Sequence, residues 1–172
     1  LLLSWLLAEV SLWAFAPQSR SISYQDRYGL GLHYPGVTRY EPRFGHDVTI
    51  NSAGMRDREH ELAKEPGVFR ILVLGDSFME AVQVPYQGSF PSLLEQSLNE
   101  LTDRTSEVVN AGVSGWGTED QLRYLTYHGI AYQPDLVLVM MTLHNDISDN
   151  LREQWYTVGQ DTLVAQNRPP IP

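Results

Sequence analysis

Three residues of the chain have the types that acyl transfer requires. Ser77 follows a glycine-aspartate pair, Gly115 lies in a glycine-rich run, and Asn145 follows an apolar segment. A serine hydroxyl can attack an ester carbonyl, and backbone or amide N–H groups can stabilise the oxyanion that forms. The N–H groups of Ser77 and Gly115 and the side-chain amide of Asn145 are three such donors. Together these residues predict a serine nucleophile with an oxyanion hole.

The segments that precede these residues are expected to position them. Short apolar runs, typical of strands buried on both faces, occur at 69–74, 107–109 and 135–141. Between them we expect two helices, one capped by Ser89 and the other by a capping box formed by Thr118 and Gln121. Strands that alternate with helices predict an α/β fold with a parallel sheet, whose ligands bind beyond the carboxyl ends of the strands. All three candidate residues follow such ends.

The three loops resemble the first three conserved blocks of the SGNH, or GDSL, hydrolase family. The matching segments, which occur in the family's order between about 68 and 150, are Gly75-Asp76-Ser77-Phe78, Asn110 to Gly115, and Asn145-Asp146. The resemblance implies a flavodoxin-like three-layer α/β/α fold with a parallel sheet, incomplete in this chain, and an esterase, lipase or thioesterase activity. It also implies Ser77 as the nucleophile, with Gly115 and Asn145 completing the oxyanion hole. The segment 51–57 looks like that of membrane-anchored bacterial members.

Two departures from the family pattern affect the predicted catalysis. Leu143 stands where the third block usually has glycine, and the 27 residues after Asn145 contain no Asp-x-x-His motif. Since a serine without a base is a weak nucleophile, we expect a chain truncated at its C-terminus and inactive alone. Asp57 and His60 match the motif but precede the serine, which favours a solvated charged turn.

Other residues near the three loops leave alternatives open. His144 lines the pocket or is simply packed or exposed, and Trp116 and Tyr86 are either rim aromatics or core residues. Asp76 is expected to hold its loop through hydrogen bonds. Taken singly, the three candidate residues also have structural readings: a helix cap for Ser77, a turn for Gly115 and a loop bridge for Asn145. His33, His46 and His128 show no partner pattern.

The first sixteen residues are apolar apart from two serines and one glutamate. A helix that spans a bilayer needs ~20 apolar residues, so this segment predicts a membrane anchor that continues upstream. A signal peptide and a buried helix are the alternatives. The predicted organisation is a hydrophobic helix at 1–17, a connector with short strands at 18–67, and the N-terminal part of an SGNH hydrolase domain at 68–172.

Composition restricts the classes of function. The 172 residues carry a net charge of −9 and no cysteine, which argues against a nucleic-acid partner and excludes thiolate catalysis. No metal-ligand spacing appears, and no cofactor is implied.

The sequence therefore predicts a membrane-anchored serine esterase, with a periplasmic or extracellular catalytic domain, that acts on a small-molecule or glycan ester. The alternatives are an O-acyltransferase for cell-envelope polysaccharide and a catalytically silent carbohydrate-binding module. The oligomeric state is left open.

Overall fold

The computed structural model describes residues 22–143 without a gap and a few short segments outside this range. The described positions are 3–6, 10–11, 22–143, 146–147, 156–158 and 163–165, the last two as strands only. Within them, no helix has the length and apolarity that a membrane span requires. Of the predicted N-terminal helix, only 3–6 and 10–11 are described, and both are helical. The rest of that prediction lies outside the described residues.

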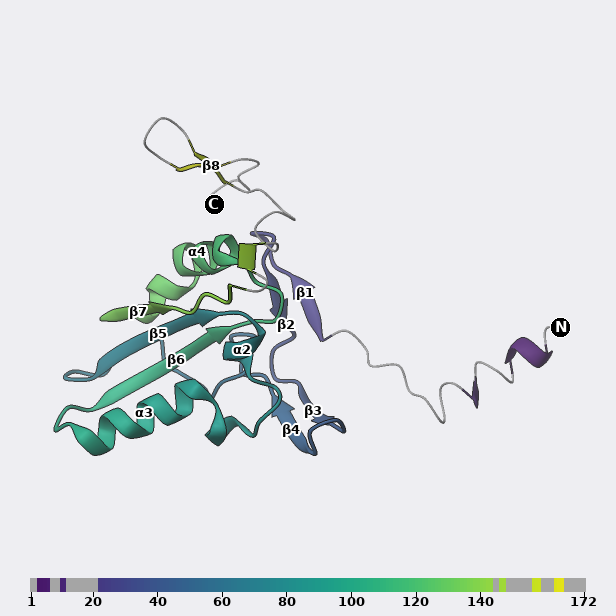
Figure 1. Ribbon diagram of the computed structural model, residues 1–172, viewed down its shortest axis with the longest axis horizontal. Helices are drawn as coiled ribbons and strands as arrows, with labels where there is room; N and C mark the ends of the chain where they lie inside the picture. Colours follow the sequence, from purple (N-terminus) through teal and green to yellow (C-terminus); the bar gives the residue numbers. More distant parts are fainter. Residues whose placement is uncertain are drawn as a thin grey trace.

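A three-stranded parallel sheet forms the centre of the fold (Figure 1). Its strands, in the order β6-β5-β7, are β5 (Phe69–Gly75), β6 (Ser106–Gly112) and β7 (Leu136–Val139). The predicted strands and their parallel pairing are thus confirmed. Gly75 pairs with Gly112, so β5 and β6 end side by side.

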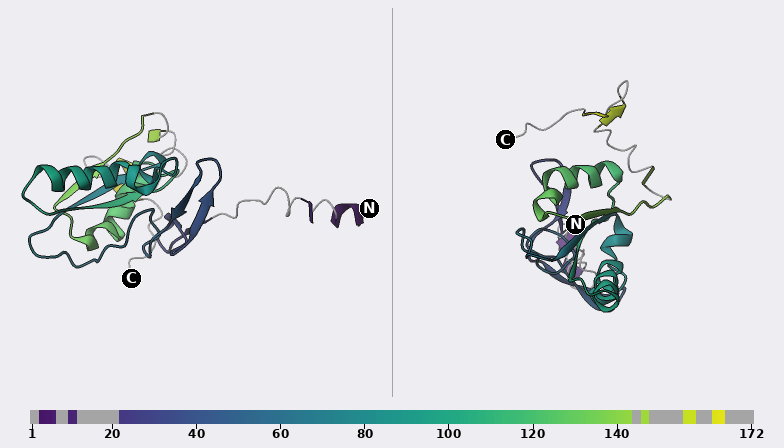
Figure 2. Two further views of the ribbon diagram at one scale, coloured as in Figure 1. Left: turned by 90° about the horizontal axis from the view of Figure 1, so that it is seen from below. Right: turned by 90° about the vertical axis from the view of Figure 1, so that its left-hand side faces the viewer.

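Helices cover both faces of this sheet (Figures 1 and 2). Along β5, Leu72 and Leu74 pack in the cluster that contains Tyr124 of α4 (Thr118–Tyr127). The alternate residues Ile71 and Val73 pack on the other face, against leucines of α3 (Phe90–Leu101). Because successive side chains point to opposite faces, the continuous apolar run supplies two cores.

The helix starts differ in detail from the predicted caps. Ser89 is the N-cap of α3, but its hydroxyl donates to the carbonyl of Tyr86, in the short helix η1 (Tyr86–Gly88), at 2.7 Å. The N-cap of α4 is Gly117, whose N–H donates to Asp120, so the predicted pairing of Thr118 with Gln121 is wrong by one residue. After α4 the chain forms the short helix η2 (Gly129–Tyr132).

The segment before β5 forms two antiparallel hairpins. These are β1 (Ser23–Gln25) with β2 (Gly31–His33), and β3 (Thr38–Glu41) with β4 (His46–Thr49). Leu30, Leu32 and Met55 are buried in the same cluster as Leu72 of β5. The lead-in, residues 22–60, therefore contributes side chains to the core. A third hairpin joins β8 (Tyr156–Val158) to β9 (Leu163–Ala165).

The outer edge of β6 is covered by side-chain acceptors. The N–H of Val108 donates to Glu95, that of Asn110 to Asp57 and that of Ser106 to Asn99, at 2.6–2.7 Å. An edge strand with unpaired N–H groups is a template for aggregation. These acceptors satisfy the outward N–H groups and so close this edge to further pairing.

His60 stands at the centre of a buried ionic network beside that edge. Its Nε2 lies 2.9 Å from Asp57 and its Nδ1 lies 2.6 Å from Glu107, which also accepts from Arg70. The His60 side chain is 1% exposed. Burial opposes its charge, but the two carboxylates outweigh burial and raise the pKa of His60. The predicted solvated turn at Asp57 and His60 is therefore wrong, because the pair is buried against β6.

We predict that His60→Gln lowers the free energy of unfolding by about 3 kcal/mol, because it removes the cation between the buried Asp57 carboxylate and the partly buried Glu107 carboxylate. The raised pKa means that the charge of His60 stabilises the fold fully below pH 6.5. This stabilisation is lost as the pH rises through the folded-state pKa. Urea unfolding from pH 6 to 9 measures the difference between the two proteins, which must shrink with rising pH.

His46→Gln serves as the control, because the ring of His46 contacts the carbonyls of Phe44 and Val82 and the ring of Phe44, outside the network of His60. A difference between wild type and His60→Gln that stays constant across this pH range would contradict a charged His60.

Candidate active site

Ser77 begins a four-residue helix, α2 (Ser77–Glu80), directly after β5. The N-cap is Asp76, which is 1% exposed and whose Oδ1 accepts from the N–H of Phe78 at 2.9 Å. As expected, Asp76 holds the loop. Ser77 itself is partly exposed, and among the described residues its backbone N–H has no hydrogen-bond acceptor. This N–H is therefore available to an incoming oxyanion.

Gly115 lies in the exposed turn that follows β6. Its φ of +85° is a conformation that favours glycine. The next residue, Trp116, is 3% exposed, and its Nε1 donates to the carbonyl of Gly31 at 2.9 Å, so it is a core residue that anchors the turn. Within the described part of the chain, the N–H of Gly115 also has no acceptor.

Two glycines allow α2 to lie on the strand ends. A Cβ at Gly112 would be 2.4 Å from Cβ of Met79, and one at Gly75 would be 2.3 Å from Cγ of the same residue. Such distances are far inside van der Waals contact. Because any larger residue would push α2 away, Gly75 and Gly112 bring the loop of Ser77 close to the loop of Gly115.

Asn110 fixes the same junction through its side chain. It is 1% exposed, and its amide nitrogen donates to the carbonyls of Arg56 and Met79, while its oxygen accepts from Gly112. One amide therefore joins the lead-in, α2 and β6. The sequence analysis included Asn110 in a motif but assigned it no role, because these partners lie far apart in sequence.

The third loop is described only in part. The N–H of Thr142 donates to Asp146 at 2.9 Å, and Asp146 returns a backbone hydrogen bond, so a short turn follows β7. Asn145 and His144 lie outside the described residues, and their predicted roles stay predictions. Leu143, at the position where the family has glycine, is 76% exposed.

No histidine among the described residues hydrogen-bonds to Ser77. His60 contacts Glu107, which lies five residues before the end of β6, and Ser77 follows the strand end paired with Gly112. At 3.3 Å per residue this separates the two groups by roughly 16 Å along the sheet. Asp57 and His60 therefore do not form the catalytic pair, in agreement with the sequence analysis.

Two other histidines contact carboxylates in a way that the sequence did not indicate. His33 lies 2.9 Å from Glu80 and is 5% exposed, whereas His128 lies 2.8 Å from Asp26. These partners are far apart in sequence, so no local spacing could reveal them. Within the described segments, no group of three His, Asp or Glu residues is arranged to hold a metal ion.

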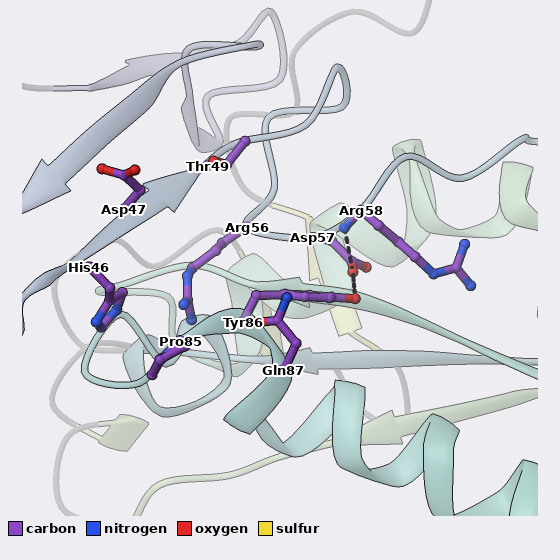
Figure 3. A pocket seen from close by; sticks show the side chains of 9 residues that line it. All are labelled: His46, Asp47, Thr49, Arg56, Asp57, Arg58, Pro85, Tyr86 and Gln87. Carbon is purple, nitrogen blue, oxygen red and sulfur yellow. Dashed lines mark hydrogen bonds between the residues drawn. The ribbon is translucent and has the colours of Figure 1, made fainter.

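A cavity of about 420 Å³ lies between β4, residues 56–58 of the lead-in and the turn before α3 (Figure 3). Its lining residues are His46, Asp47, Thr49, Arg56, Asp57, Arg58, Pro85, Tyr86 and Gln87. The Tyr86 hydroxyl donates to Asp57 at 2.6 Å. Burial and the Asp57 charge raise the pKa of Tyr86, which keeps the hydroxyl a donor. Neither Ser77 nor Gly115 is among the residues that line this cavity.

Comparison with known proteins identifies several to which parts of this chain are similar. An arylesterase from Vibrio mimicus is 39% identical over 70 residues, which cover 41% of this chain and 34% of that protein. AlinE4, a solved SGNH-hydrolase family esterase, is 25% identical, with a TM-score of 0.41 over 52% of this chain and 45% of AlinE4. A mutant of that esterase is 22% identical, with a TM-score of 0.39.

The chain thus spans about a third of the length of the arylesterase and less than half of AlinE4. Residues 73–169 match the model of the GDSL-like Lipase/Acylhydrolase family. This match begins within β5, takes in all three candidate loops and extends over more than half of the 172 residues. The chain therefore belongs to the GDSL-like lipase/acylhydrolase family.

Proposed function

We propose that the protein is a serine esterase in which Ser77 is the nucleophile. The Ser77 oxygen attacks the ester carbonyl carbon, its proton passes to the leaving alcohol, and the acyl group remains on Ser77. Water then attacks the acyl-enzyme, which releases the carboxylic acid and restores the hydroxyl. Family membership and the partly exposed position of Ser77 after a strand end support this mechanism.

The oxyanion of each tetrahedral intermediate is stabilised by three donors in this proposal. They are the N–H groups of Ser77 and Gly115 and the side-chain amide of Asn145. The observation that carries the proposal is that the first two N–H groups lack acceptors among the described residues and belong to adjacent loops. Donors fixed before the reaction do not have to reorganise as charge develops.

The general base that Ser77 requires is not assigned. The family pattern places an Asp-x-x-His downstream of the third block, and residues 146–172 contain none. Kinetic experiments use the natural protein in its full length.

We further propose a small acyl group on a carbohydrate as the substrate class and an envelope location for the enzyme. The apolar segment at 1–16 supports membrane anchoring. An O-acyltransferase would use the same residues, with a sugar hydroxyl replacing water as the acceptor. Product analysis with and without an added sugar acceptor separates the two reactions.

We predict that Ser77→Ala lowers kcat for p-nitrophenyl acetate by at least about 10³-fold, because no acyl-enzyme can form. A fluorophosphonate probe, which loses fluoride when the serine oxygen attacks phosphorus, should label the wild type and not the variant. Ser92→Ala, on α3, is the matched control. Equal hydrolysis by Ser77→Ala and wild type would contradict the proposed nucleophile, whereas hydrolysis by neither protein would make a silent binding module the better account.

Asn145→Ala tests the third donor, which belongs to a loop described only in part. Loss of one oxyanion donor typically costs about 10²- to 10³-fold in kcat, and we expect that loss with KM nearly unchanged. Steady-state kinetics with p-nitrophenyl acetate measure both constants. A rise in KM at constant kcat would show that Asn145 binds the ground state and is not an oxyanion donor.

A further inference from the structure

Glu80, the last residue of α2, is a buried carboxylate that joins three segments. Its side chain is 3% exposed. Oε2 accepts from the N–H of Ser114 at 2.7 Å and also from the Ser114 hydroxyl. Oε1 lies 2.9 Å from Nε2 of His33 on β2. Glu80 therefore connects α2 with the turn that carries Gly115 and with the lead-in.

Stability alone is a weak explanation for this arrangement. A buried charge has a large desolvation cost, and well-packed apolar residues often serve the fold equally well. Burial by itself would raise the pKa of Glu80, but the contacts with His33 and Ser114 outweigh it and lower the pKa. Glu80 is therefore ionised at neutral pH, and as a carboxylate it accepts from both donor groups of Ser114 at one oxygen.

The lead-in holds α2 from behind. Arg56 is 2% exposed, and its Nη1 donates to the carbonyls of Glu80 and Ala81 at 2.8 and 2.6 Å. Its Nη2 donates to Val84 at 2.5 Å. The guanidinium group of Arg56 and the ring of His33 hold the C-terminal end of α2. The position of the Glu80 carboxylate is therefore fixed by its own helix end.

The turn that Glu80 contacts is anchored on both sides of Gly115. On one side the Ser114 N–H is held by Glu80, and on the other the N–H of Trp116 donates to Val113 at 3.2 Å. A glycine at φ +85° has no side chain to fix its peptide plane, so these flanking contacts set the direction of its N–H.

We propose that Glu80 is a positioning residue of the oxyanion hole, which fixes the Ser114–Gly115 turn relative to Ser77. This inference rests on the proposed function, because it assigns the Gly115 N–H to the oxyanion. Glu80 does not touch the substrate. It acts by holding a donor in the place where negative charge develops.

The kinetic test compares Glu80→Gln with the wild type in the complete natural protein, using p-nitrophenyl acetate. We expect kcat to fall by about 10- to 100-fold while KM changes less than about twofold. The reason is that a misplaced oxyanion donor stabilises the transition state less and changes substrate binding little. Urea unfolding establishes that each variant is folded at the assay temperature. A kcat equal to that of the control variant overturns the proposal.

Glu95→Gln is that control. Glu95 also accepts a backbone N–H from β6, that of Val108 at 2.7 Å, and it also pairs with an arginine, Arg58. Its contact with β6 is at the third residue of the strand, whereas Gly115 follows the end of the strand. The comparison of the two variants separates two effects on kcat. Glu95→Gln removes a carboxylate that accepts from β6, and Glu80→Gln removes the carboxylate that holds the Ser114–Gly115 turn.

A double-mutant cycle tests whether Glu80 acts through Ser114. Ser114 is exposed, so Ser114→Ala leaves no buried cavity and keeps the backbone N–H. We expect Ser114→Ala to lose less kcat than Glu80→Gln. The fold-loss of kcat in the double variant should be clearly smaller than the product of the fold-losses in the two single variants. Independent, multiplicative losses overturn the coupling.

Amide hydrogen exchange gives a readout that does not depend on activity. Exchange at residues 113–117 should be at least about tenfold faster in Glu80→Gln and unchanged in Glu95→Gln. Unchanged exchange in Glu80→Gln, with an active wild type whose Ser77 reacts with the fluorophosphonate, overturns this proposal alone. An inactive wild type with unlabelled Ser77 overturns the proposed function and the catalytic role of Glu80 with it.

Discussion

The contact of Met79 with two paired glycines is the constraint on which the candidate site depends. Gly75 and Gly112 lie opposite each other at the ends of β5 and β6, and neither position leaves room for a Cβ beneath α2. Steric exclusion therefore sets how closely α2 approaches the sheet. Only at that approach can Glu80 reach Ser114 and Asn110 reach the carbonyl of Met79. The position of Ser77 follows from packing before any catalytic group is considered.

Buried polar groups make the lead-in part of the same structure. Arg56 and His33 bind α2, while Asp57 and His60 bind the outer edge of β6. Each of these groups would be costly to bury alone, and each is stabilised by partners from a segment distant in sequence. A network of this kind favours one arrangement of lead-in and sheet, since a displaced lead-in would leave several charges unpaired.

Local sequence patterns were sufficient for the three strands of the parallel sheet and insufficient for these networks. The apolar run of β5 and the turn residues after it are adjacent in sequence, so periodicity reveals them. The start of α4 was misplaced by one residue because Gly117 has no side chain that could signal a cap. His33 with Glu80 and His60 with Glu107 are 47 residues apart in each case, and only the folded topology brings them together. A histidine next to charged residues suggested solvent exposure, yet here the opposite charges allow its burial.

The shortness of α2 explains why such networks matter for the proposed catalysis. A helix of four residues aligns few peptide dipoles, so it offers little general field for an oxyanion at Ser77. Stabilisation must then come from individual donors, whose value depends steeply on distance and angle. The chain also carries a net charge of −9, which disfavours an additional anion. Because the charge of Glu80 is already held by His33 and Ser114, a carboxylate can fix the turn beside the candidate site without presenting an unpaired charge to the oxyanion.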